Sequence, residues 1–238
     1  MDKIKTTFLS DTHTLHKRLK LPGGDLLLFT GDFLSSGFRI DEFGDFVNWL
    51  METCSPIYTH ICIVAGNHDR ICETYPDYQV KDMFERKDNI HYIKDETITL
   101  DFDDKGVLTI SGTPYQPEFC NWAFNVDDSD KLQFIFDSVL DENADIWMTH
   151  CPPFNILDQT HYQRPQFGST GDEHLGSIEL YNVLKMKKPR YHVFGHIHGD
   201  GGKIIEIDGT TYINASVCNE QYKPTNQIIT LEIDGRQK

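Results

Sequence analysis

Five short segments of the sequence end in side chains that commonly bind metal ions. Each segment follows an apolar run, and the side chains after that run are carboxylates, an amide and imidazoles. The segments are SDTH with Asp11 and His13, TGD with Asp32, GNHD with Asn67, His68 and Asp69, THCPP with His150, and GHIH with His196 and His198. Oxygen and nitrogen donors without a thiolate suit borderline divalent ions such as manganese, iron or zinc. The pattern therefore predicts a metal-binding site.

The HVFGHIH stretch at residues 192–198 shows how such donors meet. Side chains at i and i+2 of an extended chain point to the same side, so His196 and His198 face one region at the end of a strand. A single histidine or aspartate at a strand end is most often a loop residue or a cap, and a neighbouring glycine often serves only a turn. Five such endings in one chain are harder to explain in that way.

The elements that must bring these endings together alternate between strands and helices. Apolar runs predict strands over 4–13, 25–32, 58–69, 89–95, 96–102, 107–115, 144–153, 190–198, 203–209, 210–216 and 227–233. The spacing of apolar residues predicts helices over 39–52, 129–142 and 175–188. This alternation indicates an α/β fold with a second, hairpin-rich mixed sheet. Open α/β sheets form their sites outside the carboxyl ends of strands.

Length and composition indicate one large domain over residues 1–238. With 238 residues, of which 39% are hydrophobic, the chain can bury a substantial core. It has no run of about 18 apolar residues, so we expect no membrane span. The six cysteines show no CxxC spacing, which indicates reduced thiols and a cytoplasmic protein. Nothing in the sequence indicates an oligomeric state.

The net charge of −15 excludes one class of partner and leaves another open. An acidic surface without a basic stripe repels long polyanions, so we expect no binding of long nucleic acid. A small phosphorylated substrate stays compatible with this charge, because bound cations reverse the field locally.

The ordered series DxH, GD, GNHD, TH and GHxH over residues 11–198 resembles the signature of the calcineurin-like metallophosphoesterases. Longer stretches, among them PGGDLLLFTGDF, GTPYQPEFCNWAFN and TTYINAS, resemble the metallophosphoesterase-domain-containing branch, which is similar to class III cyclic-nucleotide phosphodiesterases. The resemblance implies a four-layer αββα sandwich, in which two mixed sheets lie face to face with helices outside.

The resemblance also implies a binuclear metal centre. By this likeness, Asp11, His13 and His198 bind one ion, Asn67, His150 and His196 bind the second, and Asp32 bridges both. Manganese is the first expectation for both ions, and iron, zinc, cobalt and nickel are the alternatives. Two divalent ions against two carboxylates leave a local charge of about +2, which attracts a phosphate group. The ions would ionise a bridging water, and the resulting hydroxide would attack phosphorus.

The two residues after Asn67 carry the catalytic roles that the resemblance implies. His68 would protonate the leaving oxygen as a general acid. Asp69 would orient that imidazole and favour its positively charged form. The alternative for His68 is a purely structural role beside the ligands.

Two long segments, 112–125 and 152–174, lack periodicity and are candidates for binding loops. Tyr115, Trp122 and Tyr162 could stack on a nucleobase, and Arg164 could bind a phosphate. The alternative is that these aromatic side chains fill small apolar cores beneath the loops.

Departures from the protein phosphatases of the superfamily narrow the activity. In those enzymes the corresponding motifs read GDxVDRG and GNHE, whereas this chain has GDFLSSG and GNHD. This chain therefore lacks the arginine that binds phosphate in those enzymes. This difference favours a phosphodiesterase of small diesters, cyclic nucleotides among them. The alternatives are a phosphomonoesterase or phosphoprotein phosphatase and a non-catalytic scaffold with the same fold. An exonuclease fits poorly with the net charge.

Overall fold

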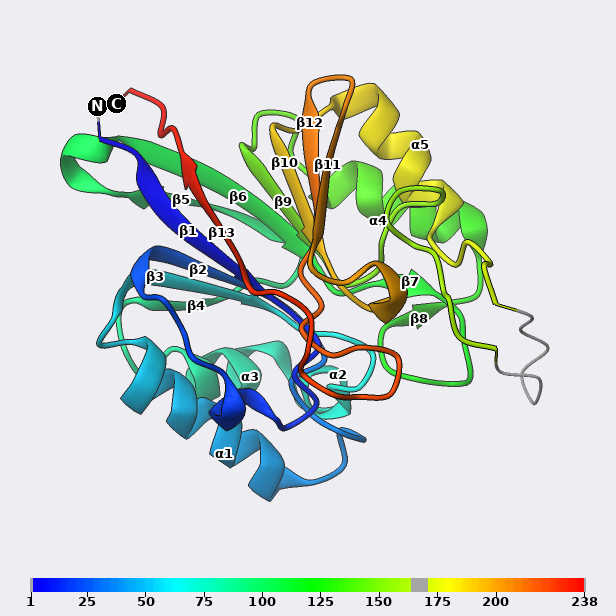
Figure 1. Ribbon diagram of the computed structural model, residues 1–238, viewed down its shortest axis with the longest axis horizontal. Coiled ribbons are helices and arrows are strands. Elements are labelled where there is room, and N and C mark those ends of the chain that lie inside the picture. The colour runs from blue at the N-terminus through cyan, green and yellow to red at the C-terminus, as the bar shows by residue number, and fades with distance from the viewer. Residues whose placement is uncertain (1, 164–170, 238) are drawn as a thin grey trace.

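Two mixed β-sheets packed face to face form the centre of the molecule (Figure 1). The computed structural model describes residues 2–163 and 171–237. The first sheet has the order β13 (Ile229–Ile233), β1 (Ile4–Leu9), β2 (Gly24–Thr30), β3 (Tyr58–Val64) and β4 (Ile90–Tyr92). Strands β1 to β4 are parallel, and β13 pairs with β1 in the antiparallel sense.

The second sheet contains six strands, of which the inner four are parallel. Its order is β11 (Lys203–Ile207), β12 (Thr210–Asn214), β10 (Tyr191–Phe194), β9 (Ile146–Thr149), β6 (Val107–Thr113) and β5 (Glu96–Asp101). The outer strands β11 and β5 are antiparallel to their neighbours. A short parallel ribbon of β7 (Gln116–Pro117) and β8 (Asn125–Val126) lies within the predicted 112–125 loop and just beyond it.

Helices cover the outer face of each sheet, as Figure 1 shows. On the first sheet lie α1 (Ile40–Trp49), the π-helical turn η2 (Leu50–Cys54), α2 (Arg70–Thr74) and α3 (Asp77–Phe84). On the second lie α4 (Ser129–Val139) and α5 (Ile178–Lys187). Both α4 and α5 begin at a capping side chain, because Asp128 accepts from the Lys131 amide and Ser177 from the Leu180 amide. Three 3₁₀ turns, η1 (His16–Arg18), η3 (Asp103–Lys105) and η5 (His198–Asp200), complete the elements named here.

The alternation of side chains along the strands produces three apolar layers. In β1 and β2, Phe8 and Leu28 point between the sheets, whereas Leu9, Leu27 and Phe29 point toward the helices of the first sheet. A third cluster fills the space between the second sheet and its two helices. The predicted four-layer αββα sandwich of two mixed sheets is therefore confirmed.

The arrangement brings the carboxyl ends of strands from both sheets to one rim. Ser10, just after β1, forms a parallel bridge with Ser216, just after β12, and this bridge joins the two sheets at that rim. Residues 70–84, for which the sequence predicts no element, form α2 and α3. Among the described residues, none of the helices combines the length and the apolar composition that a membrane span requires.

Candidate metal centre

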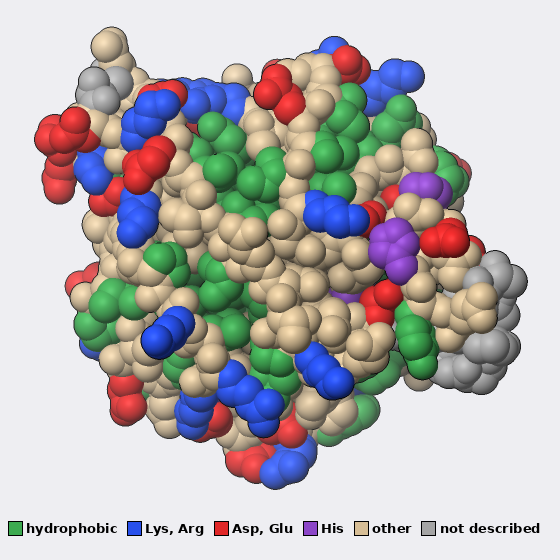
Figure 2. Space-filling view, viewed as in Figure 1, with side chains coloured by type: hydrophobic (Ala, Val, Ile, Leu, Met, Phe, Trp, Pro, Cys, Tyr) green, Lys and Arg blue, Asp and Glu red, His purple; other side chains and the backbone are tan. Residues whose placement is uncertain are grey.

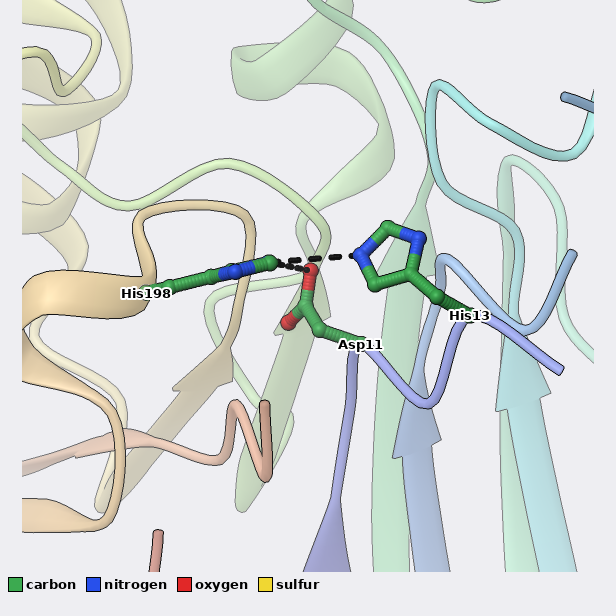
Figure 3. A group of neighbouring side chains, drawn as sticks. All are labelled: Asp11, His13 and His198. Atoms are coloured by element: carbon green, nitrogen blue, oxygen red, sulfur yellow. Dashed lines mark hydrogen bonds and ion pairs between the residues drawn. The ribbon is translucent and has the colours of Figure 1, made fainter. Parts of the chain in front are cut away.

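The first group of predicted ligands lies at the ends of β1 and β10. Figure 3 shows Asp11, His13 and His198 pointing toward one another. The His198 Nε2 atom lies 3.3 Å from His13 Nε2 and 3.3 Å from Asp11 Oδ1. All three residues are buried, although 185 residues separate His13 from His198 in the chain. The three ligand atoms are close enough to share one ion.

The second group surrounds His150 at the end of β9. The His150 Nε2 atom lies 3.3 Å from Asp32 Oδ1 and 2.9 Å from Asn67 Oδ1. The His196 ring lies 5.0 Å from the His150 ring, and its ligand nitrogen falls within reach of the same ion. The other oxygen of Asp32 is 3.8 Å from His13 Nε2, so Asp32 faces both groups. The structure thus brings all seven predicted ligands together.

Four of these residues have a backbone conformation that L-amino acids seldom adopt. The φ angles are +53° at Asp11, +40° at His13, +55° at Asp32 and +68° at His196. Such strain clusters at functional sites, where the surrounding structure enforces it. Here each strand ends abruptly, and the left-handed residue turns the ligand side chain into the rim. Gly31 allows this close approach, because a Cβ atom there would lie 2.7 Å from His150 Nδ1.

The hydrogen bonds of two histidines fit a site that binds cations. His150 Nδ1 lies 2.7 Å from the Thr30 carbonyl oxygen and His198 Nδ1 lies 3.0 Å from that of Asn219. Each Nδ1 therefore carries a proton, and the Nε2 lone pair faces carboxylate oxygen, of Asp32 and Asp11 respectively. Lone pairs that face one another at these distances repel unless a positive charge lies between them. The donor set fits divalent metal ions.

The pKa values of the site also indicate that it favours bound positive charge. Burial alone would raise the pKa values of Asp11 and Asp32. Their histidine neighbours, His198 for Asp11 and His150 for Asp32, hold both below the ordinary range. Although burial acts to lower it, the charge of Asp32 raises the pKa of His150 to about 9. Both carboxylates are therefore ionised. Without a metal ion, their negative charge is partly balanced by a proton on His150.

The two remaining predicted ligands, His13 and His196, are held in the neutral form that a metal ligand requires. Burial lowers the pKa of His13 to about 4 and that of His196 to about 3, because an imidazolium loses its hydration there. The Nδ1 atom of His13 is buried without a hydrogen-bond partner. Neither ring has to lose a proton near neutral pH before it binds an ion.

Two neighbouring residues orient the Asp11 carboxylate, and one of them, Ser216, lies outside the predicted set. The Ser216 hydroxyl donates to its Oδ2 atom at 2.7 Å, and the backbone N–H of His196 lies 3.1 and 3.0 Å from its two oxygens. These bonds leave Oδ1 directed at His198. Ser216 belongs to the TTYINAS stretch that resembles the family, but no spacing pattern in the sequence predicts its contact with Asp11.

His68 lies beside the ligands with its ring held on two sides. Its Nδ1 atom bonds to the Ser35 carbonyl oxygen, and its Nε2 atom is 4.0 Å from Asp32 Oδ2. The indole of Trp122 stacks on the imidazole, with the ring centroids 4.2 Å apart. The predicted acid therefore presents Nε2 to the cleft. The contact of the Ser35 carbonyl with His68 was not predicted, because a backbone carbonyl contact between distant residues leaves no pattern in the sequence.

The predicted contact between Asp69 and the His68 ring was wrong. The fully buried Asp69 carboxylate accepts backbone N–H groups of Gly66 at 2.7 Å, Asp32 at 2.8 Å and Leu34 at 3.0 Å. Burial and the charge of Asp32 raise its pKa, and the N–H donors oppose this rise. Because Asp69 lies at the start of α2, its side chain turns back toward the loop and ties the segments around Asp32 and Asn67 together.

A cleft of about 670 Å³ opens above the ligands. Trp122 lines it as predicted, but Tyr115 does not. Tyr115 instead packs between two apolar clusters, against Phe124, which matches the alternative interpretation of the aromatic residues. Arg164 lies outside the described residues. Tyr222, which no sequence pattern singled out, lines the cleft with its ring 4.8 Å from that of His13.

Comparison with known proteins also supports a metal-binding site. Residues 4–200 match the family model described as calcineurin-like phosphoesterase. The chain belongs to this family. Membership implies a metal-dependent hydrolase of phosphoesters, and the paired ligand groups of the structure supply the corresponding donors.

Individual relatives of the family cover most of this chain. It is 31% identical to metallophosphoesterase domain-containing protein 1 of Homo sapiens, over 94% of this chain and 69% of the human protein. Among solved structures, phosphopantetheinyl hydrolase (PptH) from Mycobacterium tuberculosis superposes with a TM-score of 0.58 at 17% identity, covering 97% of this chain and 96% of that one. The protein TT1561 of Thermus thermophilus gives a TM-score of 0.61 at 12% identity, covering 98% and 99%. The two structures share the fold.

Proposed function

We propose that this chain is a binuclear metal-dependent phosphodiesterase that hydrolyses small phosphodiesters. The observation that carries the proposal is the pair of ligand groups that share Asp32 at the floor of the cleft. Two bound divalent ions, manganese first among them, would supply Lewis acidity and activate water at neutral pH. The chain's own residues would hold the ions, position the diester and deliver a proton.

His68 is the group that we assign to proton delivery. Its Nδ1 atom is fixed on the Ser35 carbonyl, so Nε2 is the atom free to donate to the departing oxygen. Its Nε2 atom lies 4.0 Å from Asp32 Oδ2, and this proximity to the carboxylate that would be shared by the two ions supports the assignment. A general acid needs one nitrogen free to donate toward the cleft, and the fixed Nδ1 atom of His68 leaves Nε2 for that role.

The charge of the cleft supports a diester over a monoester. Arg70 is the one lysine or arginine among the described residues that line the cleft. Its Nη2 atom bonds to the Asn121 carbonyl oxygen, and its guanidinium lies over the rings of Phe38 and Trp122. No further side-chain cation of the described part is available there to bind a second phosphate charge. A singly charged diester matches this arrangement better than a doubly charged monoester.

Long nucleic acid remains an unsuitable substrate in our proposal. On the face drawn in Figure 2, lysine and arginine side chains are scattered among acidic and apolar ones and form no continuous band. With a net charge of −15, only the metal centre would attract phosphate strongly.

The experiment that tests the proposal is turnover of metal-stripped protein after addition of Mn²⁺. The panel contains bis-(p-nitrophenyl) phosphate, p-nitrophenyl phosphate, and 2′,3′- and 3′,5′-cyclic nucleotides. We expect metal-dependent hydrolysis of diesters that exceeds hydrolysis of the monoester. Faster turnover of p-nitrophenyl phosphate would overturn the diester preference and favour a phosphatase. A folded chain that binds no metal would instead favour the scaffold.

A further inference from the structure

The mouth of the cleft is bordered by large apolar side chains that are open to solvent. Phe38 is 74% exposed, Phe119 is 52% exposed and Leu175 is 52% exposed, and all three line the cleft. They come from three separate segments, namely the loop after β2, the loop between β7 and β8, and the residues before α5. Exposed apolar side chains gathered around one cavity commonly mark a ligand-binding surface.

The polar side chains of the cleft are mostly engaged within the protein. Besides the ligand group, His68 and Trp122, the described lining contains the polar side chains of Arg70, Glu118, Thr160, Glu220 and Tyr222. Glu220 accepts from the Thr160 hydroxyl at 2.5 Å and from the backbone N–H of Tyr162 at 3.2 Å. Arg70 is bonded to the Asn121 carbonyl oxygen. A nucleobase placed here would lose hydrogen bonds to water and find few replacements, which is costly.

Trp122 is also an unsuitable platform for a nucleobase. Its ring is stacked on His68 at 4.2 Å, and the Arg70 guanidinium carbon lies 5.7 Å from its centroid. The same carbon lies 5.0 Å from the Phe38 centroid, but no second ring of the described residues stacks on Phe38, which is 74% exposed. Base stacking requires an open aromatic face. The predicted nucleobase contact of Trp122 therefore loses support from the geometry.

We propose that the cleft binds phosphodiesters that carry one large, uncharged apolar ester group, and that Phe38 and Phe119 contact this group. The proposal rests on the proposed diesterase function and narrows its substrate class. The scissile phosphate would lie at the ligand cluster, and the apolar ester group would extend toward the two phenylalanines. Removal of that group from water then contributes to binding in proportion to the area buried.

The test uses a series of diesters that share one leaving group. Methyl, phenyl and 2-naphthyl p-nitrophenyl phosphate differ only in the ester group that is retained, and thymidine 5′-(p-nitrophenyl phosphate) carries a nucleoside in its place. We measure kcat/KM for release of p-nitrophenol with Mn²⁺ present. We expect the value to rise about tenfold or more from methyl to naphthyl, because the larger ring buries more apolar surface. We expect the thymidine ester to fall below the naphthyl ester.

Two variants and a matched control place the effect at the cleft mouth. Phe38→Ala and Phe119→Ala should each reduce the naphthyl-to-methyl ratio. Phe134→Ala is the control, because this residue of α4 is 72% exposed and lies outside the cleft. It should leave the ratio as it is.

The outcomes separate this inference from the proposed function. If all diesters react at equal rates, or if the thymidine ester is the best substrate, the apolar subsite is wrong while the diesterase stands. The subsite is also wrong if both phenylalanine variants keep the wild-type ratio. If no diester reacts although metal is bound, the proposed function itself fails.

Discussion

The indole of Trp122 stacks on the imidazole of His68, with ring centroids 4.2 Å apart and an angle of 27° between the planes. The His13 ring meets the same imidazole edge-on at 4.7 Å, and the Ser35 carbonyl oxygen fixes its Nδ1 atom. The side chain that we assign as the general acid is therefore held from three directions. In our account, Trp122 keeps the His68 Nε2 atom directed at the leaving oxygen.

Replacement of Trp122 by alanine should reduce turnover most for substrates with poor leaving groups. Release of an alkoxide depends on protonation far more than release of p-nitrophenolate does, so a displaced acid affects the alkyl ester first. We expect a loss of about tenfold for alkyl leaving groups and a smaller one for p-nitrophenol. The measurement is the dependence of kcat on leaving-group pKa for wild type, Trp122→Phe and Trp122→Ala.

His68→Asn provides the reference for complete loss of the acid in this comparison. It should show the steepest dependence on leaving-group pKa, with Trp122→Ala between it and wild type and Trp122→Phe close to wild type. An equal loss by Trp122→Ala on every leaving group would show that the indole serves substrate binding alone.

Replacement of Asp69 by asparagine should destabilise the protein and weaken metal binding. Three backbone N–H groups lose part of their acceptor, because one carboxylate oxygen becomes an amide donor. We expect a loss of about 1–3 kcal/mol in the free energy of unfolding. Because one of these groups belongs to Asp32, affinity for Mn²⁺ should also fall, by about 10- to 100-fold.

The measurements for Asp69→Asn are urea denaturation and calorimetric titration with Mn²⁺. The exposed Asp88→Asn variant is the matched control, since it makes the same chemical change away from the metal centre. Wild-type metal affinity in Asp69→Asn would contradict our assignment of this residue to the ligand loops.

The buried His192 should make stability fall as the pH decreases. Burial lowers its pKa to about 3, from an ordinary value of 6.5. Below pH 6.5 the unfolded chain therefore binds a proton here that the folded chain does not bind until about pH 3. Stability from this residue is complete above pH 6.5 and is lost toward pH 3, at about 1.4 kcal/mol per pH unit.

His192→Gln removes the titrating ring and retains a nitrogen able to donate to Thr149, whose hydroxyl oxygen lies 2.9 Å from His192 Nε2. The free energy of unfolding, measured by urea denaturation from pH 7 to pH 4 with a chelator present, should decline less steeply in this variant than in wild type. Parallel pH profiles would show that His192 is not held neutral in the folded protein.

The convergence of the seven predicted ligands could be predicted from the sequence because its signals are local. Each ligand follows an apolar strand, and the rules of α/β sheets place such strand ends at one edge. The roles of Asp69 and Tyr115 could not be predicted. Asp69 turns toward backbone groups of residues 32 and 34, and Tyr115 turns into the core, and both choices depend on packing between distant segments.

The elements that were missed are short and weakly patterned. Helix α2 has five residues and α3 has eight, and the run that contains them lacks a clear apolar period. Packing against the first sheet, through Ile71, Cys72, Val80 and Phe84, stabilises them instead. Tyr222 reaches the metal centre from a loop more than 200 residues away from His13, a contact that no local pattern encodes.

The most direct test of the account is a count of bound manganese. Metal-stripped wild type and Asp32→Asn are dialysed against Mn²⁺ and examined by elemental analysis and electron paramagnetic resonance. We predict two ions per wild-type chain with a spin-coupled spectrum, since both would share the Asp32 carboxylate, and loss of the coupling in the variant. One ion per wild-type chain, or two uncoupled ions, would contradict the binuclear centre.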